Sequence, residues 1–397
     1  MSDGDITARH YATGQPVRLC WKDGIISAIE AVSEAPSELW IAPSIFDLQI
    51  NGYAGIDFQQ DDLTLDDLLA ATRQLRAAGC ATYLLTLITD AWPRLMARLR
   101  QLRQLRALSA ELQSAIAGWH IEGPFLSAEP GFCGAHDASV MCDPKPEHIH
   151  ELRQLSGSDP VLLTVAPERG DAIAAISLAV SLGIKVSLGH TDAPWETLRR
   201  AVEAGASGFT HLGNGCPRQL DRHDNILWRV FETPGLTVSL IPDRIHLSPA
   251  LFRLIHRSIG AASVYYTTDA MSAAGAPPGK YKIARLELEV GADQVVRLPG
   301  GPNFAGSALR PIDGVFRAAE MLHCSWQEIW PRFSAVPARL MGLSGGELQA
   351  GQPATFCVLE VPAGNQLQSV RTFVAGETPE GDATLPAPPL FRAGMSG

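Results

Sequence analysis

The stretch AIAGWHIEGPF, residues 115–125, places a single carboxylate, Glu122, at the end of an apolar run. The small and apolar residues that precede it are typical of a buried strand, and Gly123 with Pro124 ends that strand and turns the chain. A carboxylate in such surroundings costs free energy unless a positive group meets it. The stretch therefore predicts a buried strand whose last side chain has a cationic partner.

Runs of this kind recur in both directions from residues 115–125, and helical patterns separate them. Alternation of strands with helices implies parallel strand pairing. Eight such units predict an α/β fold, a (β/α)8 TIM barrel over residues 41–344. The expected strands are residues 40–50, 81–89, 115–123, 161–168, 185–190, 208–212, 237–243 and 264–270.

The two ends of the chain differ from this middle region. Residues 1–40 and 345–380 have the pattern of short strands with turns and without helices. Two separated β-rich segments can bury their apolar faces together if they share one unit. We therefore expect a small β-sandwich domain beside the barrel, formed by both segments. The tail, residues 381–397, is rich in proline and glycine and is predicted to be irregular.

The composition limits the partners and the location of the protein. Of the 397 residues, 46% are hydrophobic and 19% charged, as in an ordinary globular chain. The net charge of −10 leaves no basic excess for nucleic acid. No run of about 18 apolar residues exists for a membrane span. The seven cysteines form no C-x-x-C pair, and the acidic N-terminus does not resemble a signal peptide, so we expect a cytoplasmic protein.

Polar side chains stand where the expected strands end, which is where barrel enzymes carry their chemistry. Glu122, His190 and His211 end three of the strands, and Asp269 ends the last. A single buried histidine is usually satisfied by its neighbours, but two histidines with one carboxylate are a common ligand set for catalytic zinc. Such a metal lowers the pKa of its bound water towards about 7, and Asp269 is placed to move the proton. The pattern favours zinc-type hydrolysis of an amide.

Four motifs in this order resemble one known family. HIEGPFL, SLGHTDA, FTHLGNGCP and TTDAMSAAG are similar to motifs of the N-acetylglucosamine-6-phosphate deacetylases of the amidohydrolase superfamily. The resemblance covers roughly residues 40–345 and implies removal of acetate from N-acetylglucosamine-6-phosphate. One divalent metal per subunit is expected, with zinc first and with iron, cobalt and manganese also compatible with the ligand set. A homodimer with a small-molecule amino sugar substrate is expected.

The resemblance assigns roles residue by residue. Glu122, His190 and His211 match the metal ligands, and Asp269 matches the acid and base. His136, in CGAHD, matches the histidine that polarises the substrate carbonyl. The implied substrate contacts are Asn214, Gly215, Arg222 and His246, with Arg222 at the position of an arginine that binds the phosphate from its own or the neighbouring subunit.

Two features depart from the patterns of related proteins. Many members of the superfamily begin their barrel with H-x-H and hold two metals, whereas this chain has Gln49 and Asn51 there. Amides are poor zinc ligands, so the second metal position should be vacant. Arg222 is flanked by Asp221 and Asp224, which we expect to weaken its hold on a phosphate.

Other functions are compatible with parts of the pattern. One is a deacetylase or aminoacylase for an unphosphorylated N-acyl compound, or for another N-acetylhexosamine phosphate. A deaminase of the same superfamily would need the missing H-x-H. A catalytically inactive binding protein would have lost metal ligands, which this chain retains.

Overall fold

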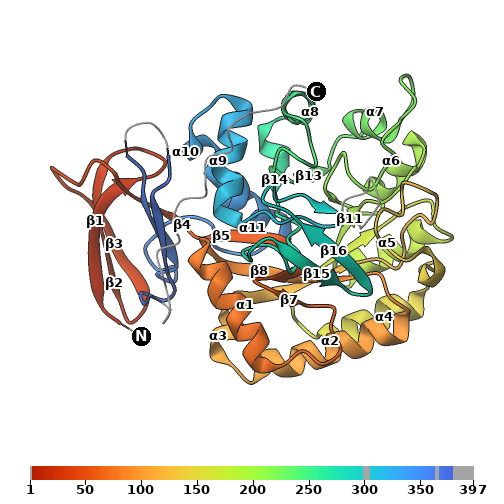
Figure 1. Cartoon of the computed structure of the whole chain (residues 1–397), viewed down its shortest axis with the longest axis horizontal. Coiled ribbons are helices and arrows are strands. Elements are labelled where there is room, and N and C mark those ends of the chain that lie inside the picture. The colour runs from red at the N-terminus through yellow and green to blue at the C-terminus, as the bar shows by residue number, and fades with distance from the viewer. Residues whose placement is uncertain (1, 298–304, 363–365, 379–397) are drawn as a thin grey trace.

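The computed structural model describes residues 2–297, 305–362 and 366–378. Its centre is an eight-stranded sheet in the order β14-β13-β12-β11-β10-β9-β8-β5, with parallel neighbours throughout (Figure 1). This sheet confirms the predicted barrel class. Its strands are β5 (Ile45–Ile50), β8 (Cys80–Ile88), β9 (Ile116–Glu122), β10 (Val161–Val165), β11 (Lys185–Leu188), β12 (Gly208–Phe209), β13 (Thr237–Leu240) and β14 (Val264–Tyr266).

The first and last strands of this sheet meet just beyond their ends. Ile50 forms a parallel bridge with Ala270, and the Asn51 amide donates a hydrogen bond of 2.7 Å to the Ala270 carbonyl. The buried Asp47 carboxylate on β5 accepts hydrogen bonds from the Thr268 amide (2.9 Å) and the Thr268 hydroxyl (2.7 Å). Since a charged acceptor strengthens a buried hydrogen bond, Asp47 helps to hold the barrel closed.

Helices surround the barrel and bury apolar faces against it (Figure 1). The first begins with a capping box between Thr64 and Asp67, which satisfies amides at its start. The helices are α1 (Leu65–Ala77), α2 (Trp92–Ala107), α3 (Ala110–Ala115), α4 (Pro146–Ser156), α5 (Ala172–Ser181), α6 (Trp195–Glu203), α7 (Ile226–Phe231), α8 (Pro249–Ile259), α9 (Pro311–Leu322), α10 (Trp326–Ile329) and α11 (Ala335–Met341). No helix in the described part of the chain is both long and apolar enough to cross a membrane.

The expected first strand, residues 40–50, is two strands in the structure. β4 (Leu39–Pro43) pairs with β18 outside the barrel, and β5 begins after Ser44. Pro43 has no amide hydrogen to donate, which suits the end of a strand. The chain therefore passes from the small sheet into the barrel at this point.

Both ends of the chain build the second sheet, in the order β19-β18-β4-β1-β2-β3. It curls so that Trp21 on β2 lies 5.6 Å from Phe356 on β18, ring centre to ring centre. The two layers expected of a sandwich are therefore parts of one curled sheet. The domain division at residues 40 and 345 stays a prediction, and residues 381–397 lie outside the described chain. The other strands are β1 (Gly4–His10), β2 (Pro16–Lys22), β3 (Ile25–Ala31), β18 (Phe356–Glu360) and β19 (Ser369–Phe373).

A small antiparallel sheet follows the last barrel strand and was not expected from the sequence. β15 (Gly279–Ile283), β16 (Leu286–Val290) and β17 (Val296–Arg297) form it. The Asp57 carboxylate, in the short hairpin of β6 (Gly52–Tyr53) and β7 (Ile56–Asp57), accepts the Ala284 amide at 2.8 Å. This bond ties the small sheet to the loop after β5.

Candidate active site

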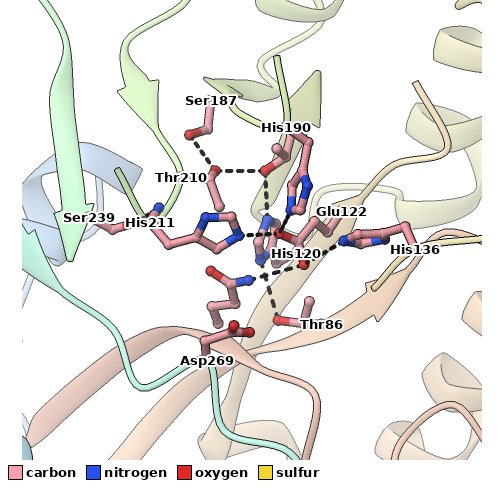
Figure 2. A network of polar contacts seen from close by, with 12 residues as sticks. Thr86, His120, Glu122, His136, Ser187, His190, Thr210, His211, Ser239 and Asp269 are labelled. Atoms are coloured by element: carbon pink, nitrogen blue, oxygen red, sulfur yellow. Dashed lines mark hydrogen bonds and ion pairs between the residues drawn. The ribbon is translucent and has the colours of Figure 1, made fainter. Parts of the chain in front are cut away.

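Glu122 ends β9 inside the barrel and is met by two imidazoles (Figure 2). Its Oε1 lies 2.9 Å from His211 Nε2 and 3.4 Å from His190 Nε2. Its Oε2 accepts a hydrogen bond of 3.0 Å from Gln49 Nε2. Burial opposes ionisation, but hydrogen bonds from the histidines hold the pKa of Glu122 well below its usual range. The positive partner expected for Glu122 is therefore provided by these two imidazoles, which could hold a cation together with the carboxylate.

The residues at the strand ends have unusual backbone conformations. His190, His211 and Asp269 have φ angles of 51°, 32° and 52°, a region that non-glycine residues rarely adopt. Such conformations persist where the surrounding structure enforces them, and they concentrate at functional sites. A side chain on Gly215 would meet the His190 ring at 2.8 Å, so this glycine allows its loop to pack against the imidazole.

The donor set fits a divalent metal. His190 Nδ1 donates to the Phe132 carbonyl at 2.7 Å, so its Nε2 lone pair faces the Glu122 carboxylate. Two electron-rich groups at that distance need a proton or a metal ion between them. Ligand atoms of Glu122, His136 and His190 lie within 4.8 Å of one another, a grouping of metal-binding size. His211 approaches the same carboxylate, so three imidazoles are candidates to join Glu122 as ligands.

Asp269 faces this cluster from the opposite side of the cavity (Figure 2). Burial and the negative charge of Glu122 raise the pKa of Asp269 to about 7. Its Oδ1 accepts a hydrogen bond of 2.7 Å from Asn51 Nδ2. Gln49 and Asn51 thus each donate a side-chain amide hydrogen bond to one of the two carboxylates, an arrangement that orients both acidic side chains.

A layer of hydroxyl groups lies beneath Glu122 and was missed in the sequence. His120 is two residues before Glu122 on β9, so both side chains face the barrel interior. Burial lowers the pKa of His120 to about 4. Its Nε2 lies 2.8 Å from Thr164 Oγ1 and its Nδ1 3.3 Å from Thr86 Oγ1, and Thr164 continues to Thr210 at 2.9 Å. The alternation of side chains along a strand could have predicted that His120 faces the same interior as Glu122.

His246 is held by Asp243, another residue that the sequence did not suggest. Its Nδ1 lies 2.6 Å from Asp243 Oδ2, while Asp243 Oδ1 accepts the amides of Ile245 and His246 at 2.8 Å each. Burial opposes the charge, but His246 lowers the pKa of Asp243. The pair fixes the ring nitrogen that bears the proton, so the imidazole has one orientation.

The cluster forms the floor of a cavity of about 730 Å³, a size usual for small-molecule sites. The predicted Asn214, Gly215 and His246 line it, and Arg222 does not. The Arg222 side chain is exposed and donates to His223 Nε2 at 2.9 Å. Ile283 and Leu286, at the small sheet that was not expected, also line the cavity. The site residues predicted from the sequence that line its floor are Asn51, Glu122, His136, His190, His211 and Asp269.

The acidic residues beside Arg222 have other partners. Asp224 binds Arg229 through two contacts of 2.6 and 2.9 Å, and the Asp221 carboxylate accepts the amides of His223 and Asp224. Neither carboxylate forms a hydrogen bond or ion pair with Arg222 in the described part of the chain. Asp221 and Asp224 therefore do not neutralise Arg222 by direct contact, contrary to expectation, because backbone amides and Arg229 occupy their carboxylates.

A carboxylate and imidazoles at the strand ends of a parallel barrel, with a second carboxylate opposite, define a metal-dependent hydrolase of the barrel type. No protein-family model matches the chain. It is 31% identical over 350 residues to the N-acetylglucosamine-6-phosphate deacetylase of Bos taurus, which is 85% of this chain and 82% of that protein. The chain therefore belongs to the N-acetylglucosamine-6-phosphate deacetylase family of the amidohydrolase superfamily.

Two further likenesses agree with this membership. The N-acetylgalactosamine-6-phosphate deacetylase of Escherichia coli O157:H7 is 29% identical over 344 residues, which is 85% of this chain and 89% of that protein. A variant N-acetyl-D-glucosamine-6-phosphate deacetylase from Mycobacterium smegmatis, solved with N-acetyl-D-glucosamine-6-phosphate, has a TM-score of 0.84 and 28% identity. That alignment covers 95% of this chain and 99% of the other. The names of these relatives thus differ in the amino sugar, which is N-acetylglucosamine in some and N-acetylgalactosamine in the E. coli protein.

Proposed function

We propose that this protein hydrolyses the N-acetyl amide of N-acetylglucosamine-6-phosphate to glucosamine-6-phosphate and acetate. The observation that carries the proposal is the buried Glu122 between His190 and His211, opposite Asp269, in a chain of this family. A divalent metal held by Glu122, His190 and His211 would polarise the amide carbonyl and lower the pKa of the attacking water.

Asp269 is proposed to carry the proton through the reaction. A carboxylate within reach of the attacking water can accept its proton and later return it, and Asp269 lines the cavity opposite Glu122. The proton taken from water during attack is then given to the amide nitrogen as the carbon–nitrogen bond breaks. The hydrogen bond from Asn51 to Asp269 Oδ1 holds the carboxylate in place and leaves Oδ2 to exchange the proton. Glucosamine-6-phosphate leaves with the amine, and acetate carries the new oxygen.

His136 and His246 are proposed to bind and orient the substrate. Burial and the neighbouring His190 lower the pKa of His136 to about 3, so a neutral ring faces the cavity. A neutral imidazole that donates to the carbonyl oxygen stabilises the charge that develops there during attack. Asn214 Nδ2 is buried without a partner and lines the same cavity, which supports a contact with a sugar oxygen.

We further propose one metal per subunit, with zinc as the native ion, in a cytoplasmic homodimer. The hydrogen bonds that Gln49 and Asn51 donate to carboxylates support a single metal. Arg222 is exposed on a loop, which supports a role at the cavity of a neighbouring subunit. The homodimer is testable by light scattering of the purified protein.

Acetate release by zinc-loaded protein tests the proposal. The substrates are N-acetylglucosamine-6-phosphate, N-acetylgalactosamine-6-phosphate and N-acetylglucosamine at equal concentrations. Fastest release from the first supports the proposal. Fastest release from the second, the substrate in the name of the E. coli relative, keeps the chemistry and changes the sugar. Fastest release from the unphosphorylated sugar supports the alternative deacetylase, and no release from any of them overturns the function.

A further inference from the structure

Arg218 is the side chain in the cavity wall that nothing so far explains. Among the described residues that line the cavity, it is the one lysine or arginine. Its side chain is exposed, and no hydrogen bond, ion pair or ring contact within the described chain involves it. An arginine that borders an enzyme cavity without a partner has all five of its donors available to a ligand.

The loop that carries Arg218 runs from the buried end of the cavity to its exposed end. His211, Asn214 and Arg218 follow one loop that leaves the floor of the cavity and reaches its mouth. In such a sugar, the acetamido group on C2 and the phosphorylated C6 on C5 stand at opposite ends of the ring. A substrate whose acetyl group lies at Glu122 therefore extends its phosphate away from the floor.

The charges around the cavity favour an anion at this end only. The carboxylates that line it, Glu122 and Asp269, belong to the floor. Asp221 and Asp224, farther along the same loop, are absent from the lining, and Arg229 and backbone amides occupy their carboxylates, so neither is bonded to Arg218. Arginine binds phosphate through paired hydrogen bonds, which lysine cannot reproduce.

We propose that Arg218 binds the phosphate of the substrate within its own subunit and thereby sets the preference for phosphorylated sugars. This inference rests on the proposed deacetylase function and adds a residue that reads the anion. It assigns to Arg218 the role that Arg222 cannot fill in its own cavity, since Arg222 is absent from the lining.

The kinetic test compares Arg218→Ala and Arg218→Lys with wild type on N-acetylglucosamine-6-phosphate and N-acetylglucosamine. We expect kcat/KM for the phosphorylated sugar to fall about 10- to 100-fold in Arg218→Ala, because that is the usual effect of losing hydrogen bonds to a charged group. The change should lie mainly in KM, since the phosphate is remote from the reacting carbonyl. Values for the unphosphorylated sugar should not change, and Arg218→Lys should fall between.

The control is Arg257→Ala, which removes another exposed arginine, on α8, that does not line the cavity. It should leave both substrates unaffected, which excludes a general effect of net charge. Equal losses on both sugars in Arg218→Ala would show a damaged loop and overturn the proposal. Unchanged selectivity in Arg218→Ala, with selectivity lost in Arg222→Ala, would assign the phosphate to Arg222.

A binding measurement separates this inference from the proposed function. Calorimetry with glucosamine-6-phosphate needs no turnover, and Arg218→Ala should weaken this binding by a similar factor. If wild type binds the sugar phosphate through Arg218 but releases no acetate, the function fails and the inference stands. If binding is equally strong in both proteins, the inference fails whatever the activity.

Discussion

The floor of the cavity is formed by buried strand ends, whereas part of its mouth is formed by an exposed loop. At the floor, Glu122, His190 and His211 are at most 5% exposed and sit at strand ends whose backbone the barrel fixes. At the mouth, Arg218 is exposed on a loop and has no side-chain partner in the described part of the chain. The difference indicates that the barrel fixes the proposed metal ligands, whereas the proposed recognition of the phosphate depends on an exposed loop.

The largest effect expected at the floor is loss of the metal. The proposed ligands include His211, which lies 2.9 Å from Glu122, whereas the grouping of ligand atoms within 4.8 Å of one another is formed by Glu122, His136 and His190. We expect His211→Asn to lose both the bound metal and nearly all activity, and His136→Asn to keep one metal per chain while kcat falls. Metal analysis of the purified variants measures this. Metal retained in His211→Asn and lost in His136→Asn would exchange the two roles.

Replacing Asp269 tests proton transfer separately from metal binding. Asp269→Asn should lower kcat by roughly 10²–10⁴, the usual share of general acid–base catalysis. It should retain the metal and bind glucosamine-6-phosphate as wild type does. Steady-state kinetics with calorimetry checks both. Turnover near that of wild type would remove Asp269 from the mechanism.

The contact between Asp57 and the small sheet at the mouth should make the free energy of unfolding depend on pH. Burial raises the pKa of Asp57, which holds the Ala284 amide, to about 6. The folded protein therefore keeps this proton to a higher pH than the unfolded chain, and stability falls as pH rises from about 4 to about 6. The full effect is about 3 kcal/mol at 1.36 kcal/mol per unit.

The measurement is urea unfolding at several pH values, for wild type and for Asp57→Asn. The difference in unfolding free energy between them should change over that range and be constant above pH 7. A difference that does not vary with pH would show that Asp57 has an ordinary pKa.

The smallest effect expected is in the layer beneath the floor. Thr164→Val removes the oxygen that meets His120 Nε2 and leaves a buried polar atom without a partner. The cost should be about 1–3 kcal/mol of unfolding free energy. Thr164→Ser keeps the hydroxyl and should lose less. Equal stability of the valine variant and wild type would show that this layer carries little of the floor's rigidity.

The same contrast explains what the sequence predicted. That Glu122, His190, His211 and Asp269 line one cavity could be predicted, because a polar residue after an apolar run marks a strand end and strand ends meet in a barrel. The break at Ser44 was missed because β4 and β5 are both apolar and nearly continuous.

Features of the mouth were harder to predict. The alternation in LELEV of β16 is a strand signal, but a regular barrel has no position for an extra sheet there. The loop that carries Arg218 and Arg222 has no periodic pattern, so the direction of either side chain could not be predicted. The surroundings of His120 depend on contacts between segments, such as its 2.8 Å approach to Thr164, whereas Asp243 depends on the turn that brings its carboxylate back to His246.

A metal titration tests the central claim, a single-metal hydrolase, most directly. Zinc is added stepwise to protein stripped by a chelator, and acetate release from N-acetylglucosamine-6-phosphate is followed, with Glu122→Gln alongside. We predict activity that rises in proportion to zinc and stops at one equivalent per chain, with none in Glu122→Gln. Full activity before zinc is added, or a rise that continues to two equivalents, would contradict the account.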